Sequence, residues 1–347
     1  MADSTDAADP EPAAEPAGPS LLSRPPEEGA RLLALAFLDQ AAAARPRLAD
    51  PEDDEALHDF RVALRRLRSG LRAYRDWLDD SVPKKLGKRL RRLAAATGSG
   101  RDAEVQIAWL RSRGRLPPSH RPGLAWLLLR LEERKRQAYA ELVEEVADEF
   151  SLVESDLRRK LSVYQAEVHL DRDTPRPTLG AATAAILHAQ IEELTDHFAR
   201  IDDPGDEKQA HRARIAAKRL RYLLEPFKGE VPAVAAIVQR LKALQDLLGE
   251  LHDAHVLEHE LADQVAAAAA ERATQLLDLT LEGSTDPAPL CAARRRRHEP
   301  GLLAFAQANR ARRDEVFERL EEGWLQGRAD GFLGELSGLE PVLAEGE

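Results

Sequence analysis

A basic helical motif occurs twice in this sequence, separated by about 150 residues. The first copy begins at His58 and the second at His211. At about 100° per residue on a helix, each copy separates into an apolar face and a basic flank beside it. The flanks consist of His58, Arg61, Arg65, Arg68, Arg72 and Arg75 in the first copy, and His211, Arg214, Lys218, Arg221 and Lys228 in the second. Rows of guanidinium and ammonium groups form charge-assisted hydrogen bonds with anions, so both copies are predicted to bind an anionic ligand.

The distribution of charge favours the same interpretation. The chain has a net charge of −11, yet residues 55–92 carry +7 and residues 211–242 carry +6. An acidic protein that concentrates cations in two matching segments is suited to an anionic partner. The match has one exception, since Glu225 occupies the position of Arg72.

The composition predicts an all-α protein. The 347 residues are 43% hydrophobic and only 5% aromatic, and alanine and leucine are abundant. A single cysteine, Cys291, excludes an intrachain disulfide and favours the cytoplasm. No signal-peptide pattern and no apolar run of about 18 residues is present, so we expect no membrane-spanning segment.

The apolar periodicity predicts helices over residues 29–45, 50–83, 84–96 and about 123–150, with a further helix resuming at Arg101 after an interruption at 97–100. The predicted domain organisation is a disordered acidic leader (1–28), a first repeat (29–172), a second repeat (173–330) and an acidic C-terminal tail (331–347).

The two repeats share more than the basic motif. Residues Gly98 to Asp102 match Gly249 to Asp253, and the pair Arg134-Lys135 matches Arg312-Arg313. The offset between copies is 153 residues at first, then 151, then 178. A constant order with small changes in offset is typical of a duplication with insertions.

This pattern resembles the CHAD family of histidine-containing α-helical domains. The resemblance rests on His58-x-x-Arg61-x-x-x-Arg65-Arg66-x-Arg68, on its second copy from His211 to Arg221, and on the Gly-x-x-x-Asp element at Gly98. It implies two four-helix units related by a pseudo-twofold axis around a central basic groove or pore that binds inorganic polyphosphate. The fold class expected from it is therefore an all-α helical bundle.

The resemblance also implies a polyphosphate-binding set. Its members are His58, Arg61, Arg65, Arg66, Arg68, Arg72, Lys88, Arg89, Arg92, Arg101, His211, Arg214, Lys218, Arg219, Arg221, Arg240, Lys242 and His252. The first motif spans about 21 Å along a helix, which is long enough for several linked phosphates. Because the motif histidines lie beside cations, we expect binding to tighten as the pH falls through about 6.5.

Two other functions remain open. A nucleic-acid-binding protein would use the same cations, but the basic flanks lack interleaved aromatic residues for base stacking. A metal-dependent phosphohydrolase is suggested by the His-Asp pairs at His58 and His252 and by the spacing of His252, His255 and His259, which could hold a metal ion.

Signals of catalysis are otherwise missing. The sequence contains no phosphate-binding Gly-x-x-x-x-Gly-Lys loop and no Gly-x-Ser-x-Gly nucleophile turn. We therefore expect a non-enzymatic polyphosphate-binding protein without a cofactor, located in the cytoplasm and associated with polyphosphate granules.

Overall fold

The computed structural model describes residues 20–50, 53, 55–78, 81–97, 99–162, 177–282, 287–295 and 297–346. Every regular element within these ranges is a helix, which confirms the predicted all-α class. The predicted leader up to residue 19 and the predicted boundary between repeats near residue 172 lie outside the described residues.

The first half contains α1 (Pro26–Ala44), the short helix η1 (Pro46–Ala49), α2 (Ala56–Ala73), α3 (Arg75–Leu78), α4 (Lys84–Ala96), α5 (Ser99–Ser112) and α6 (Arg121–Leu161). The predicted interruption after residue 96 is confirmed as the break between α4 and α5. Three predicted ends were wrong. The motif helix α2 begins at Ala56 rather than near Asp50, and Asp53 forms an ion pair with Arg47 (2.7 Å) of η1. Helix α2 also ends at Ala73 rather than near residue 83, and the separate short helix α3 follows it. Helix α6 extends beyond the predicted end at residue 150.

The second half contains α7 (Leu179–Phe198), α8 (Glu207–Leu224), η2 (Glu225–Phe227), α9 (Pro232–Leu281), α10 (Pro287–Arg295), α11 (Glu299–Trp324), α12 (Asp330–Ser337) and α13 (Leu339–Glu345). Helix α9 runs without a break for 50 residues, whereas the corresponding part of the first half is divided into α4 and α5.

The two motif helices, α2 and α8, pack against each other within the main hydrophobic core. Their apolar faces are fully buried, as at Phe60 and Leu64 in α2 and Leu220 in α8. The halves are also joined by a buried hydrogen bond of 2.8 Å between the hydroxyls of Tyr74 and Thr183. Burial of one face fixes the rotation of each helix, so the basic flanks are held in a defined direction.

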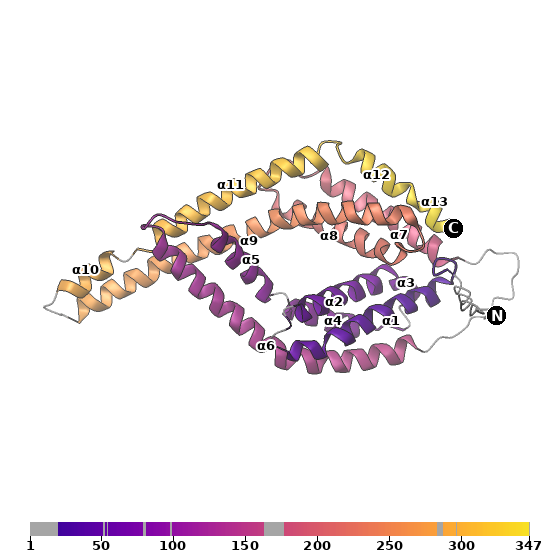
Figure 1. The fold of residues 1–347 in the computed structure, drawn as a ribbon, viewed down its shortest axis with the longest axis horizontal. Coiled ribbons are helices and arrows are strands. Elements are labelled where there is room, and N and C mark those ends of the chain that lie inside the picture. The colour runs from indigo at the N-terminus through magenta and orange to yellow at the C-terminus, as the bar shows by residue number, and fades with distance from the viewer. Residues whose placement is uncertain are drawn as a thin grey trace, which may run out of the picture.

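At the other end of the molecule, α5 and α6 meet α9 and α11 around a smaller apolar cluster (Figure 1). Gly123 of α6 and Gly301 of α11 allow the helices to approach closely. A Cβ added to Gly123 would lie 2.6 Å from the carbonyl oxygen of His298 and 2.9 Å from the Cα of Gly301. Glycine is therefore required at this crossing.

Both ends of the described chain take part in the main core. The C-terminal helices α12 and α13 bury Phe332 and Leu343, and the N-terminal Leu22 is also buried. The backbone N–H of Gly180 donates to the carbonyl of Leu22, so the N-terminal segment is attached to α7. None of the described helices is both long and apolar enough to cross a membrane.

Candidate anion-binding site

The basic flanks of α2 and α8 meet at Lys218. Arg65 and Arg68 of α2 and Arg214 and Arg221 of α8 all act electrostatically on this amine. Burial, followed by repulsion from these four guanidinium groups, lowers the pKa of Lys218 to about 7. Cations from both halves therefore form one central cluster, which we define as Arg61, Arg65, Arg68, His211, Arg214, Lys218, Arg221 and His252.

Two histidines, His211 of α8 and His252 of α9, extend this cluster to a third helix. The rings of His211 and His252 lie 4.8 Å apart between centroids. Burial and the nearby Arg214 lower the pKa of His211, and the same causes lower the pKa of His252 to about 4. His252 is therefore neutral in the free protein near pH 7. The pH dependence expected from the sequence concerned the motif histidines His58 and His211, and it stays a prediction.

Two aspartates lie at one side of the cluster, at matching positions of the two repeats. Asp102 interacts with Arg61 and Arg214, and Asp253 interacts with Arg214. Burial raises the pKa of both carboxyl groups, and the adjacent guanidinium groups oppose this rise. These acids anchor arginines, as their positions beside the basic motif suggest, and they balance part of the positive charge around Arg214.

Four nitrogen atoms of the central cluster are buried without a hydrogen-bond partner among the described residues. Two are the donors Nε of Arg65 and Nε of Arg221, and the other two are Nδ1 of His211 and Nδ1 of His252, each of which donates or accepts according to the tautomer. A buried donor without an acceptor costs free energy, about 1–3 kcal/mol for each group. A ligand with many oxygen acceptors and negative charge would do two things at once: it would accept hydrogen bonds from these donors, and it would neutralise the positive charge of the central cluster.

The cluster continues along α2 toward α4. Arg91 of α4 lies close enough to Arg68 and Arg72 to lower the pKa of both guanidinium groups, although burial is the larger cause in each case. Arg72 also interacts with Arg219 of α8. Arg91 was not among the residues predicted from the sequence, although its position on the exposed side of α4 could have indicated it.

Other predicted residues pair with carboxylates instead. Arg66 binds Glu225 through two hydrogen bonds of 2.7 and 3.1 Å, which makes Glu225 a link between the halves rather than a gap in the basic row. Four more predicted cations have acidic partners: Arg89 with Glu149, Arg101 with Glu104, Arg219 with Glu193, and Arg240 with Glu335. These interactions reduce their capacity to hold an added anion.

The remaining predicted residues lie at the surface. His58 is exposed in the first turn of α2, and Lys88, Arg92 and Lys242 are exposed on α4 and α9. Arg92 makes only a long contact with Glu149, at 3.7 Å.

The three histidines considered as a metal site have different neighbours. His252 lies against His211, Nε2 of His255 is 2.7 Å from the carbonyl oxygen of Pro204, and the exposed His259 is 3.7 Å from Glu207. Among the described residues, no group of three His, Cys, Asp or Glu side chains is arranged to hold a metal ion.

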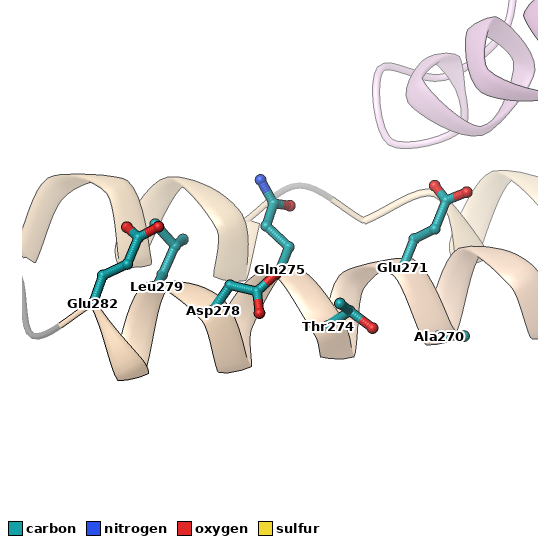
Figure 2. A pocket seen from close by; sticks show the side chains of 7 residues that line it. All are labelled: Ala270, Glu271, Thr274, Gln275, Asp278, Leu279 and Glu282. Atoms are coloured by element: carbon teal, nitrogen blue, oxygen red, sulfur yellow. The ribbon is translucent and has the colours of Figure 1, made fainter.

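A shallow, open depression lies on the far part of α9, about 27 Å along the helix from Asp253. Figure 2 shows its lining residues along the helix: Ala270, Glu271, Thr274, Gln275, Asp278, Leu279 and Glu282. Three of them are acidic, so this surface would repel a polyanion. The central cluster is the better candidate for anion binding.

Comparison with known proteins identifies the family. The family model of the CHAD domain matches residues 33–262. The crystal structure of the CHAD domain from the plant Ricinus communis is similar in fold, with a TM-score of 0.57, 20% sequence identity, and coverage of 91% of this chain and 92% of that one. No curated protein matches the sequence significantly. Because the family model covers well over half of the residues, and includes both basic motifs, this chain belongs to the CHAD family.

Proposed function

We propose that this protein binds inorganic polyphosphate in the central cluster and does not transform it. The observation that carries this proposal is the meeting of α2 and α8 cations around Lys218, a position where positive charge is costly without an anion. The family is linked to polyphosphate binding in general, which supports the choice of ligand. We place this activity in the cytoplasm, at polyphosphate granules.

The physical chemistry of the cluster fits a linear polyanion. Arginine presents several donors in a planar fork that suits phosphate oxygens, and the cluster contains five arginines. Polyphosphate has no bases, so it requires no stacking platform. The ring of Tyr222 lies beneath Arg221, with 4.8 Å between the guanidinium carbon and the ring centroid, so it is covered by a cation of the cluster.

The test is a titration with polyphosphates of graded length. We expect the wild-type protein to bind them with an affinity that falls steeply as salt increases. A variant with Arg61, Arg65, Arg214 and Lys218 changed to Glu is expected to lose at least about tenfold in affinity.

A matched control changes four exposed arginines elsewhere, namely Arg115, Arg136, Arg310 and Arg328, to Glu. Its net charge equals that of the cluster variant, so equal losses in both would show that only total charge matters. Short DNA or RNA that displaces polyphosphate at equal phosphate concentration would favour a nucleic-acid-binding function. Phosphate release in the presence of divalent metal would favour a phosphohydrolase.

A further inference from the structure

The outer surface of α4 is strongly basic and lies beside the central cluster. Leu86, Leu90 and Leu93 form the buried side of this helix. The opposite side exposes five cations, which we call the α4 face: Lys84, Lys85, Lys88, Arg91 and Arg92. Over its 13 residues α4 contains no acidic residue, so nothing within the helix neutralises these charges.

Among the described side chains of the neighbouring helix α6, those that form ion pairs with α4 do so mainly at Arg89. Glu149 and Asp156 of α6 pair with Arg89, which is partly buried and does not belong to the α4 face. Among the described residues, Lys84, Lys85, Lys88 and Arg91 form no ion pair, and Arg92 has only its long contact with Glu149. Such a concentration of unpaired cations is unfavourable unless an anion lies near it.

The α4 face is continuous with the central cluster. Helix α4 packs against α2. Arg91 of α4 interacts with Arg68 and Arg72 of α2, and Arg68 in turn interacts with Lys218. A helix of 13 residues adds about 20 Å to the length of the basic surface. A polyanion that occupies the central cluster could therefore continue over α4 without crossing an uncharged gap.

The corresponding surface of the second half is different. With the offset of 151 residues, Lys84, Lys85, Lys88 and Arg92 correspond to Ala235, Ala236, Gln239 and Ala243, which are exposed on α9 and uncharged. Arg240 pairs with Glu335 of α12 and lies over Phe332, with 4.5 Å between the guanidinium carbon and the ring centroid. Among the described residues 235–247, Lys242 is the one exposed cation without an ion pair, and the exposed Asp246 adds a negative charge.

We propose that a polyphosphate chain longer than the central cluster leaves it in one direction, over the α4 face, and not over the equivalent surface of α9. This inference rests on the proposed function and deepens it, since it assigns a second contact surface used by long chains only. Short polyphosphate would contact the central cluster alone.

The test compares two variants that each remove two exposed cations. The α4 variant is Lys84→Gln/Lys88→Gln, and the matched α9 variant is Arg240→Gln/Lys242→Gln. Each is titrated with a short polyphosphate that the cluster alone can cover, and with a chain on the order of a hundred phosphates long. We expect the α4 variant to bind the long chain about three- to tenfold more weakly than wild type, with a salt slope lower by about 1–2, and to bind the short chain normally. Arg240 and Lys242 belong to the set that the resemblance implies, but they lie outside the central cluster and outside the α4 face, so the α9 variant is expected to bind both chains as wild type does.

Footprinting by lysine acetylation gives an independent readout on the wild-type protein. The long chain is expected to protect Lys84 and Lys88, the short chain is not, and Lys242 is expected to remain reactive with both. Unchanged long-chain affinity in the α4 variant, or equal losses in both variants, would overturn this inference while leaving the proposed function intact. Failure of wild type to bind either chain would overturn the proposed function itself.

Discussion

The lowered pKa of Lys218 predicts that the proposed binding of polyphosphate depends on pH. With a pKa of about 7, this amine would be half deprotonated at neutral pH in the free protein. The groups around it are Arg65 and Arg68 from α2, His211, Arg214 and Arg221 from its own helix, and His252 from α9. A bound polyanion would stabilise the ammonium form and raise the pKa, so binding takes up a proton above pH 7. Affinity must therefore decrease as the pH rises.

The magnitude follows from one-proton linkage. If the bound amine stays protonated up to about pH 10, the affinity falls about 25-fold between pH 6.5 and pH 8.5, approaching tenfold for each pH unit above about 8. Isothermal titration calorimetry in buffers of different ionisation enthalpy measures the same effect directly. We expect uptake of about half a proton at pH 7 and about 0.9 at pH 8.

The control is Lys218→Arg, which keeps the positive charge at every pH in this range. Its affinity for polyphosphate is expected to depend less on pH than that of wild type, and any remaining slope reports His211 and His252 of the cluster together with the terminal phosphates. If wild type and Lys218→Arg show the same pH dependence, Lys218 does not titrate on binding and the reasoning is refuted. An unchanged affinity of wild type over this pH range would refute it equally.

Three further predictions concern stability. Lys218→Met should raise the free energy of unfolding of the unliganded protein at pH 7 by on the order of 1–2 kcal/mol, because it removes a buried cation from a like-charged cluster. The same variant should bind polyphosphate more weakly. Thermal unfolding measures the first effect and titration with polyphosphate measures the second. Gly123→Ala should destabilise the protein by about 1–3 kcal/mol, because the added Cβ meets the backbone of α11. Gly87→Ala should stabilise α4 by about 0.5–1 kcal/mol in the same melting assay, because a Cβ at Gly87 meets nothing within 4 Å. A double-mutant cycle of Arg66→Ala and Glu225→Ala should give a coupling free energy of up to about 1 kcal/mol in denaturant unfolding. A coupling free energy near zero would show that this ion pair does not hold the two halves together.

The sequence predicted the helices and the duplicated motif well, because both depend on local periodicity. The apolar stripe of α2 contains Phe60, Leu64 and Leu67, and burial of that stripe leaves only one direction for the basic flank. The partners of individual arginines could not be predicted in this way. Arg66 and Arg68 are both arginines and lie two residues apart. Arg66 binds Glu225 from the other half of the chain, whereas Arg68 belongs to the central cluster.

The sequence alone predicts that this chain is helical, duplicated and basic on one flank of each repeat, because these properties follow from residue type and spacing within single helices. The excess of positive charge on α4 over the matching part of α9 can also be read from the sequence, since α9 carries alanine or glutamine at most of the matching positions. Only the packing of the helices brings the two flanks together, lowers the pKa of Lys218 through burial and like charge, and pairs Arg240 with Glu335 of α12. Charge and burial act between helices through space, and spacing along the chain does not encode those distances.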